Sequence, residues 1–281
     1  MTQATLYVVA TPIGNLDDLS PRARRILQEV DLIAAEDTRH SRRLLSHFSI
    51  DTPLVAVHEH NEEAAVNELI GRLTNGESIA LICDAGTPLV NDPGYRLLQA
   101  AHANVVCVSP VPGPCAAVAA LSVAGLPTDR FAFEGFLPAK SSARRARLDG
   151  LRDEQRTLIF YESVHRFRDT LADMSSAFGG ARRAFVGREL TKLHEQCHAA
   201  PLDELQRLVD SGDMVLRGEF VIVVDGAARR SPETKKIDED QLLAALCEVL
   251  PGKQAVDIVA RVGGGRRNEI YQRMLALKAK N

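Results

Sequence analysis

The stretch Ile82-Cys83-Asp84-Ala85-Gly86-Thr87-Pro88-Leu89-Val90-Asn91-Asp92-Pro93-Gly94 decides the fold of this chain. It follows the apolar run 78–82, which predicts a buried strand, and it precedes residues 95–103, which predict a helix. Its glycines and prolines predict a loop whose backbone can approach a ligand closely, with Asp84 at the end of the strand. Ligands bind at the carboxyl ends of the strands in an open α/β sheet, so the stretch predicts a binding site, although taken alone it also fits a plain surface turn.

Length and composition fit a globular protein with one large domain or two medium ones. The 281 residues are 45% hydrophobic and 25% charged, and the net charge of −3 excludes a uniformly basic nucleic-acid coat. The five cysteines form no C-x-x-C pair, which argues against a disulfide framework and against a thiolate zinc site. Because no apolar run reaches about 18 residues and the N-terminus lacks a basic start, we expect a soluble, cytoplasmic protein without a membrane span.

Apolar runs alternate with amphipathic helical segments through the first part of the chain. The runs lie at 5–10, 32–35, 54–57, 78–82 and 105–108. Between the first two, Ser20-Pro21 predicts a helix start, and the apolar side chains after it recur with helical spacing. This alternation predicts an α/β fold with a mainly parallel sheet.

Four more apolar runs, at 131–136, 158–161, 184–188 and 220–224, predict a second α/β unit. We therefore predict an N-terminal α/β domain at 1–113, a C-terminal α/β domain at 114–226 and a polar linker at 227–237. Residues 238–281 have helical spacing throughout, with three glycines at 263–265 before the last helix. They predict a small all-helical extension that resembles a helix-turn-helix.

Clustered cations interrupt the acidic background of the chain. The largest cluster comprises Lys140, Arg144, Arg145, Arg147, Arg152 and Arg156. It predicts contact with a phosphate backbone, and together with Arg39, Arg42 and Arg43 it can line one cleft. The tail adds Arg266, Arg267 and Arg273, which predict nucleic-acid contact. The first cluster can instead be a solvated face, and the tail a helical cap that only packs on the body.

The segment His194-Glu195-Gln196-Cys197-His198 matches H-E-x-x-H, which on a helix places two imidazoles around Zn²⁺ with the glutamate as general base. A zinc hydrolase is therefore one alternative. The helix would be short, because Ala199-Ala200-Pro201 follows at once, and no third ligand stands out. His58 and His60 offer a second metal-like spacing, but a polar cluster at a strand end beside a substrate cleft fits them better.

Seven motifs resemble the branch of the tetrapyrrole methylase superfamily that methylates small-subunit ribosomal RNA. The motifs are Ala10-Thr11-Pro12-Ile13-Gly14-Asn15-Leu16, Ala35-Glu36-Asp37-Thr38-Arg39, Asp84-Ala85-Gly86-Thr87-Pro88, Pro112-Gly113-Pro114, Glu134-Gly135-Phe136-Leu137-Pro138, Phe160-Tyr161-Glu162-Ser163 and Arg188-Glu189-Leu190-Thr191-Lys192. They run in order over residues 5–226, and the tail resembles the helical C-terminal extension of the same enzymes. Relatives that act on tetrapyrroles have a glycine-rich first loop where Thr11 to Asn15 stands here, which favours RNA as the substrate.

The resemblance implies two α/β domains with S-adenosylmethionine in the cleft between them. It also implies 2′-O-methylation of a cytidine in small-subunit (16S) ribosomal RNA, with the assembled subunit as the substrate and a homodimer as the enzyme. Carried over by position, cofactor contacts fall at Pro12, Asp84, Ala85, Gly86, Thr87, Cys115, Ala116, Phe160, Tyr161 and Glu162. The candidate contacts to RNA are Arg39, Arg43, His60, Asn61, Lys140, Arg144, Arg145, Arg266 and Arg267.

Methyl transfer to a ribose hydroxyl needs no metal, but it needs in-line alignment and a proton acceptor. A carboxylate or a lysine with a depressed pKa serves this purpose. The candidates are Glu36 and Asp37 at a strand end, and Lys192 with Glu195 in the second domain. Two further alternatives stay open at this point: a methylase of the same superfamily that acts on a tetrapyrrole, and an RNA-binding assembly factor without catalysis.

Overall fold

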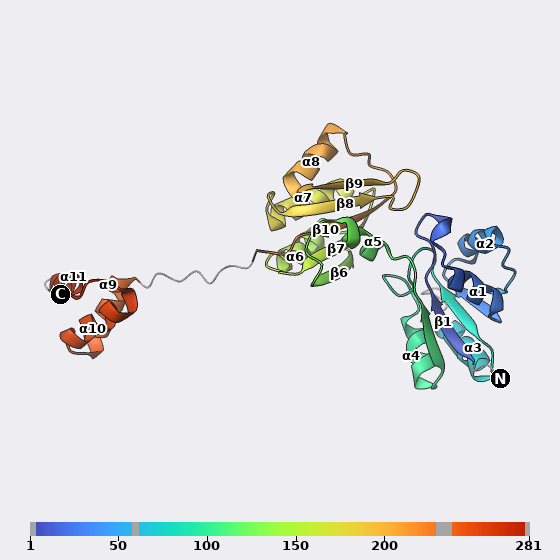
Figure 1. Cartoon of the computed structure of the whole chain (residues 1–281), viewed down its shortest axis with the longest axis horizontal. Coiled ribbons are helices and arrows are strands. Elements are labelled where there is room, and N and C mark those ends of the chain that lie inside the picture. Colours follow the sequence, from blue (N-terminus) through green and yellow to red (C-terminus); the bar gives the residue numbers. More distant parts are fainter. Residues whose placement is uncertain (1–3, 58–61, 229–237, 279–281) are drawn as a thin grey trace. The chain divides into compact units, whose positions relative to one another are not determined.

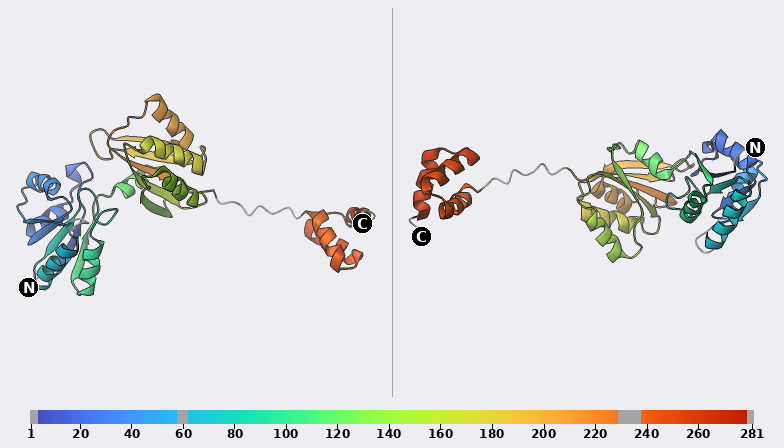
Figure 2. Two further views of the ribbon diagram at one scale, coloured as in Figure 1. Left: turned by 180° about the vertical axis from the view of Figure 1, so that it is seen from behind. Right: turned by 90° about the horizontal axis from the view of Figure 1, so that it is seen from below.

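The computed structural model describes residues 4–57, 62–228 and 238–278. The chain divides into two compact units, Met1–Ala227 and Ala228–Asn281, drawn in Figures 1 and 2. Among the described residues, the helices are too short or too polar for any of them to cross a membrane. The predicted α/β class with a helical C-terminal extension is confirmed. The boundaries of the domains predicted inside the first unit stay a prediction.

The first sheet of the first unit is parallel throughout. Its strands are β1 (Thr5–Val9), β2 (Leu32–Ala35), β3 (Leu54–Ala56), β4 (Ile79–Ile82) and β5 (Cys107–Val111), in the order β3-β2-β4-β1-β5. The helices α1 (Pro21–Glu29), α2 (Thr38–His47), α3 (Glu62–Thr74) and α4 (Tyr95–Ala103) connect them. Because the strands are parallel, the loops after β1 and β4 leave the same edge of the sheet. The strand order also reverses beside β1, and ligands bind at such a point in folds of this kind.

Side-chain alternation explains why helices cover both faces of this sheet. In β2, Ile33 and Ala35 pack into the core formed with α1 and α2. Leu32 and Ala34, one residue out of phase, pack into the core formed with α3 and α4. A strand that is buried on both faces has a continuous apolar sequence, which is why the apolar run at 32–35 predicted β2. The predicted helix start at Ser20-Pro21 is also confirmed, because Ser20 Oγ accepts a hydrogen bond from Ala23 N at 3.0 Å.

One strand of this sheet lies later in the chain than we predicted. Residues 105–108 were expected as a strand, but β5 spans Cys107–Val111. Val105 has φ +56° and a side chain that is 89% exposed, because it turns the chain after α4. The Val106 N–H then donates to Ala101 O at 2.9 Å and completes the turn. A β-branched residue in a left-handed conformation is uncommon, so hydrophobicity alone misplaced this boundary.

The second sheet is mixed, and it contains one strand that the sequence did not predict. Its strands are β6 (Phe131–Phe136), β7 (Thr157–Ser163), β8 (Arg183–Arg188), β9 (Gln196–Pro201) and β10 (Glu219–Val224), in the order β6-β7-β10-β8-β9. The unpredicted strand, β9, pairs with β8 at the edge. Its side chains are short or polar and none is fully buried, so it lacks the apolar run that marks the other strands.

Helices cover both faces of the second sheet (Figure 1). One face packs against α6 (Ser141–Gly150), α7 (Phe167–Phe178) and α8 (Leu202–Ser211), with Phe160, Phe167 and Phe220 at its centre. The Phe167 and Phe220 rings stack with centroids 4.1 Å apart. The other face packs against the small-residue helix α5 (Ala116–Val123), which leaves room for the loops of the first sheet.

The second unit contains three described helices, α9 (Glu239–Val249), α10 (Gly252–Gly263) and α11 (Arg267–Lys278). Their shared core consists of Leu243, Ala255, Val256, Val259, Ile270 and Met274. Gly264 has φ +75° and ends α10, so the glycine turn predicted before the last helix is present. Most of the predicted linker, 227–237, lies outside the described residues.

Candidate functional site

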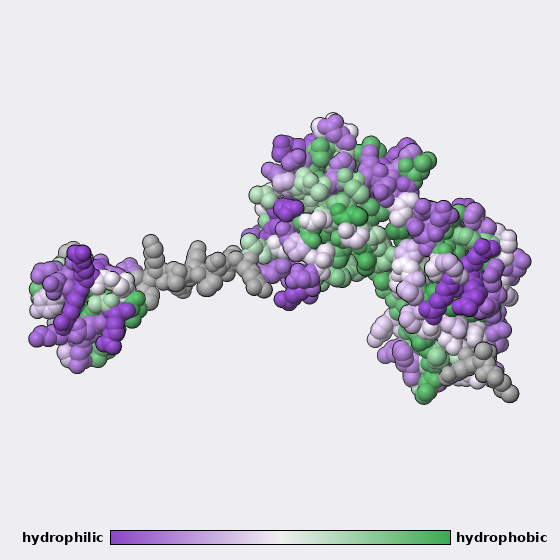
Figure 3. Space-filling model, in the orientation of Figure 1, coloured by the Kyte–Doolittle hydropathy of each residue, from purple (hydrophilic) through white to green (hydrophobic). Residues whose placement is uncertain are grey.

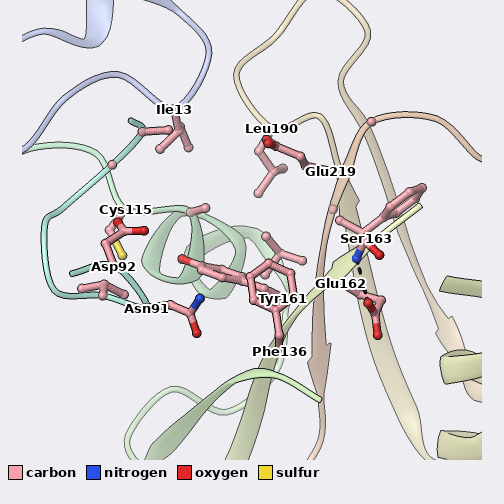
Figure 4. Close-up of a pocket in the computed structure, with 18 of the residues that line it drawn as sticks. Ile13, Asn91, Asp92, Cys115, Phe136, Tyr161, Glu162, Ser163, Leu190 and Glu219 are labelled. Atoms are coloured by element: carbon pink, nitrogen blue, oxygen red, sulfur yellow. Dashed lines mark hydrogen bonds between the residues drawn. The ribbon is translucent and has the colours of Figure 1, made fainter. Parts of the chain in front are cut away.

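A cavity of about 470 Å³ opens at the carboxyl edge of the first sheet and is shared with the second sheet. The loops after β1, β4 and β5 form one wall, and β7, β10 and the segment 187–192 form the other. Figure 4 shows Asn91, Asp92 and Cys115 on one side, facing Tyr161 and Phe136 on the other. Ile13 and Leu190 approach each other from opposite walls and narrow the space between them (Figure 4).

Hydrogen bonds between loops make the first wall a single piece. Thr11 and Gly86 exchange backbone hydrogen bonds, with N···O distances of 2.8 and 3.1 Å. Thr87 Oγ1 donates to Pro114 O at 2.9 Å and ties in the loop after β5. Gly86 has φ +88°, and a Cβ there would lie 3.3 Å from Ile13 Cγ2. The predicted need for glycine in this loop is therefore met by both its conformation and its packing.

The acidic residues after β2 lie on the same rim as Asp84, as we predicted. Asp84 Oδ1 accepts a hydrogen bond from Asp37 N at 3.1 Å, which joins the ends of β2 and β4. Asp37 also caps α2, and its hydrogen bonds with Arg39 lower the pKa of its carboxyl to about 2. Such a carboxylate is a weak proton acceptor. Among the residues that line the cavity, neither Glu36 nor Asp37 appears.

Asp92 supplies the first wall with a partly buried carboxyl group. Burial raises the pKa of Asp92, a hydrogen bond with the Cys83 thiol lowers it, and the charge of Asp84 raises it further. Burial and the neighbouring Asp92 also raise the pKa of Cys83, so its sulfur stays a thiol. The net result is a cavity-facing carboxyl group that holds a proton more readily than an exposed aspartate.

Aromatic side chains from the second sheet form the floor of the cavity. The Tyr161 hydroxyl accepts a hydrogen bond from Ala117 N at 3.1 Å, and Phe133 packs edge-on against its ring at 4.9 Å. Burial and the neighbouring Cys115 raise the pKa of Tyr161, so it stays a neutral phenol. Cys115, the residue before α5, makes no side-chain cap of its own, and the tyrosine hydroxyl takes over that role.

Glu162 lines the cavity, but its carboxylate is already engaged. It is 2% exposed and accepts from Ser163 N at 2.8 Å and from Thr170 Oγ1 at 2.7 Å. Arg166 forms an ion pair with it at 2.7 Å and also donates to Leu137 O at 3.0 Å. A buried carboxylate with this many partners orders the chain after β7 and has little capacity left for a ligand.

A three-residue charge network closes the second wall. Lys192 Nζ lies 2.9 Å from Glu189 Oε1 and 2.9 Å from Glu219 Oε2. Burial lowers the pKa of Lys192, but the hydrogen bonds with both glutamates outweigh it and leave the pKa above its ordinary value. Lys192 is therefore a cation, and the expectation of a lysine with a depressed pKa is wrong.

The predicted cofactor contacts fall into two groups. Seven line the cavity: Ala85, Gly86, Thr87, Cys115, Ala116, Tyr161 and Glu162. Pro12 and Asp84 lie next to lining residues, and the Phe160 side chain points into the core on the opposite face of the sheet. Sequence reasoning missed Asp92, although it lies inside the stretch that decides the fold. It also missed Phe136 and Glu219, which only the pairing of the second sheet brings to the cavity.

Some of the cations predicted to contact RNA pair with a carboxylate in the structure, and others do not. Arg144 is wrong as a contact, because it is 4% exposed and pairs with Asp173 at 2.7 Å inside the core. Arg39 pairs with Asp37 and Arg267 pairs with Asp257, whereas four exposed cations have no carboxylate partner among the described residues. These four are Arg43, Lys140, Arg145 and Arg266. His60 and Asn61 lie outside the described residues.

The H-E-x-x-H match does not form the helix that a zinc site of this type requires. Residues from Gln196 onward belong to β9, and His194 lies in the turn before it. Glu195 is exposed and accepts a hydrogen bond from Thr191 N at 2.6 Å, away from the cavity. The spacing of the two histidines is therefore that of a turn and an edge strand.

Comparisons with known proteins match both units of the chain. The family profile "Tetrapyrrole (Corrin/Porphyrin) Methylases" matches residues 5–206, and "RsmI C-terminal HTH domain" matches residues 233–278. A protein named ribosomal RNA small subunit methyltransferase I from Pseudomonas aeruginosa is 52% identical, with 100% of each chain covered. The protein of that name from Xylella fastidiosa (strain Temecula1) is 52% identical, over 96% of this chain and 98% of its own.

The first unit also resembles solved structures of low sequence identity. One is a uroporphyrin-III C-methyl transferase from Thermus thermophilus, complexed with S-adenyl homocysteine. Its TM-score is 0.53 at 18% identity, over 78% of this chain and 97% of that chain. At this identity the likeness establishes the fold alone.

Proposed function

The chain belongs to the tetrapyrrole methylases and, among them, to the ribosomal RNA small subunit methyltransferase I family; from this we propose 2′-O-methylation of a cytidine in small-subunit ribosomal RNA, with S-adenosylmethionine as methyl donor. One observation carries the proposal: full-length relatives named for ribosomal RNA match both units at 52% identity. The solved uroporphyrin-III C-methyl transferase matches 78% of this chain. The helical second unit matches instead the C-terminal domain profile of the ribosomal RNA enzymes, and this favours RNA over a tetrapyrrole as the substrate. A ribosomal substrate also fits activity in the cytoplasm.

The cavity fits S-adenosylmethionine in size and in chemistry. Its volume of about 470 Å³ lies within the range of roughly 300–1,000 Å³ that is typical of small-molecule sites. Ile13, Leu190 and Val221 offer apolar contacts, while the carboxyl groups of Asp92 and Glu219 favour a positively charged ligand. The glycine at position 86 keeps the backbone free to approach a ligand. S-adenosylmethionine supplies an electrophilic methyl group when it is bound.

We assign the role of proton acceptor to Asp92. Three of the described residues that line the cavity carry carboxyl groups, namely Asp92, Glu162 and Glu219. Glu162 is engaged with Arg166 and Thr170, and Glu219 pairs with Lys192 while its side chain is 79% exposed. Asp92 is partly buried and its pKa is raised toward the working range of a general base. The other candidates then have structural roles. Glu36 and Asp37 stabilise the rim, and Lys192 and Glu195 stabilise the second wall.

The proposal is tested by methylation of small ribosomal subunits that lack this modification. Purified protein is incubated with the subunits and labelled S-adenosylmethionine, and the RNA is digested and analysed by mass spectrometry. We expect one mole of 2′-O-methylcytidine per mole of subunit. Label on a base, or no label in RNA while a tetrapyrrole acceptor is methylated, would reject the proposal. A parallel reaction with protein-free RNA tests our further proposal that the assembled subunit is the substrate.

We also propose that the protein acts as a homodimer. Two exposed apolar side chains on α5 support this, because Val118 and Val123 are 55% and 58% exposed. Apolar side chains exposed on the surface favour association. Analytical ultracentrifugation of the full chain at micromolar concentration should give twice the monomer mass of 30.6 kDa, and a monomer at that concentration contradicts the proposal.

A further inference from the structure

The helices α1 and α2 form one basic face of the first unit. Both pack on the same side of the first sheet, through Ala23, Ile26, Leu27 and Leu45. Their exposed cations are Arg22, Arg24, Arg25, Arg39, Arg42 and Arg43. Figure 3 shows hydrophilic surface over these two helices. A protein of net charge −3 that gathers six arginines on two adjacent helices presents a local site for a polyanion.

Five of these six arginines have no carboxylate partner among the described residues. Among the described residues of the two helices, only Arg39 has an ion pair, with Asp37 at 3.1 Å. Arg22 donates to Ser109 Oγ at 3.3 Å, a neutral partner. In the second-sheet domain, by contrast, Arg147, Arg152, Arg156 and Arg168 each pair with a carboxylate. Guanidinium groups without such partners are available to bind phosphates.

A groove of about 320 Å³ runs along this face and contains an aromatic ring. It is lined by Leu16, Leu19, Arg24, Arg25 and Phe48, among others. The Arg24 guanidinium lies 5.7 Å above the Phe48 ring centroid, and the His47 ring contacts the same ring edge-on at 4.9 Å. One carboxylate, Asp17, also lines the groove and can accept from a base amino group or a ribose hydroxyl. An aromatic ring beside guanidinium groups fits an unpaired nucleotide of RNA.

The groove lies close to the cavity along the chain. Ile13 lines the cavity and Leu16 lines the groove, so three residues, or at most about 11 Å of backbone, separate the two sites. Leu16 begins the short helix η1 (Leu16–Asp18), which the Asn15 side chain caps by accepting from Asp17 N at 3.1 Å. A single RNA strand can therefore reach both places, with the target ribose at the opening of the cavity and a neighbouring nucleotide in the groove.

We propose that the α1–α2 face binds ribosomal RNA beside the target nucleotide, with one unpaired base stacked on Phe48 and its flanking phosphates on Arg24 and Arg25. The inference rests on the proposed function and adds a specific contact surface to it. Stacking needs a flipped-out or single-stranded base, so the site selects RNA in which the target lies in a loop. The contact would supply affinity and position, and it leaves cofactor binding to the cavity.

The test compares two double variants that each remove two exposed arginines. Arg24→Gln/Arg25→Gln removes the groove cations, and Arg152→Gln/Arg168→Gln removes cations that pair with Asp149 and Asp210. Binding of small-subunit RNA is measured against salt concentration, and S-adenosylmethionine affinity is measured by calorimetry. We expect the first variant alone to bind RNA about tenfold more weakly and its salt slope to fall by about 1.4–1.8, since each lost phosphate contact contributes about 0.7–0.9.

A third variant tests stacking with little loss of volume. Phe48→Leu should weaken RNA binding roughly 5- to 150-fold without changing the salt slope, because stacking is not ionic. Equal RNA affinity and equal slope in Arg24→Gln/Arg25→Gln and wild type would overturn the inference. Failure of the wild type to methylate would instead reject the proposed function, since RNA binding is scored separately.

Discussion

The two walls of the cavity each carry a carboxyl group whose acidity is shifted, but in opposite directions. On the first wall, burial raises the pKa of Asp92. On the second wall, burial also raises the pKa of Glu189, yet the hydrogen bonds with Lys192 and with the Glu219 backbone outweigh it and the net pKa is lowered. The difference lies in the neighbours: Asp92 has a thiol and a second acid beside it, and Glu189 has a cation. One wall can therefore take up a proton, while the other holds fixed charges.

The largest effect should follow from removing the proton acceptor of the first wall. Asp92→Asn preserves shape and abolishes basicity, so single-turnover methylation should slow by about 10²–10⁴-fold at saturating cofactor. The matched control is Glu219→Gln, which removes a carboxylate that lines the same cavity on the second wall. We expect that control to stay within about tenfold of wild type. If both variants lose activity equally, the two walls are not chemically distinct.

A smaller effect should follow from removing the cation of the second wall. Lys192→Met leaves Glu189 and Glu219 without their partner, and the Glu189 side chain is only 18% exposed. We expect the free energy of unfolding to fall by about 1–2 kcal/mol after allowing for partial exposure, which corresponds to roughly 2–8 °C in Tm. Calorimetry measures the change, and Lys192→Arg should restore most of it. An unchanged Tm in Lys192→Met would show that the ion pairs of Lys192 with Glu189 and Glu219 contribute no net stability.

The hydroxyl of Tyr161 joins the walls through the start of α5. Tyr161→Phe keeps the ring contacts but leaves Ala117 N without its acceptor. The loss of a helix cap costs about 1 kcal/mol, so Tm should fall by about 2–4 °C. Cofactor affinity should fall in parallel, because α5 begins at the cavity. A fall in Tm without any change in affinity would limit the hydroxyl to a structural role.

The smallest effect is a pH dependence of opposite sign for the two carboxyl groups. The folded pKa of Asp92 is raised above the ordinary 3.8, so its stabilising contribution is present below that pH and is lost as pH rises through the folded pKa. The folded pKa of Glu189 is lowered below 4.5, so its contribution is present above that pH and is lost as pH falls through the folded pKa. At pH 7, Asp92→Asn should therefore raise Tm and Glu189→Gln should lower it.

Thermal unfolding of both variants between about pH 3 and 8 measures these differences. Each difference from wild type should shrink toward acidic pH, where both groups are protonated in the folded and unfolded states. Tm differences of the same sign at pH 7 would contradict the contrast between the walls.

The fold was predictable to the extent that burial leaves a continuous apolar run. The central strands β1, β2 and β4 contribute side chains to the cores on both faces of the first sheet, so each was located in the sequence to within a few residues. Edge strand β9 has no such signal, and its pairing with β8 depends on partners far along the chain. The prediction that Arg144 contacts RNA failed for a related reason, because the composition of segment 140–156 does not reveal that Arg144 is buried against Asp173.

The candidate site was predictable where one loop contains it and not where two sheets create it. Asp84 and Gly86 follow a recognisable strand, so their place at the edge of the sheet could be expected. The position of Glu219 depends on β10 pairing with β7. That of Lys192 depends on an unusual turn in which Glu189 and Thr191 have φ +48° and +67°. Neither feature leaves a local pattern in the sequence.

The strand order of the second sheet has a consequence for synthesis on the ribosome. The first sheet has all its strands once residue 111 has emerged, whereas the central strand of the second sheet, β10, is the last to be made. Until residues 219–224 emerge, β7 and β8 lack the strand that separates them, and their unpaired edges are open to wrong partners. The nascent chain therefore acquires the second wall of its cavity in a late step, and a ribosome stalled before Glu219 would carry a first sheet without a completed binding site.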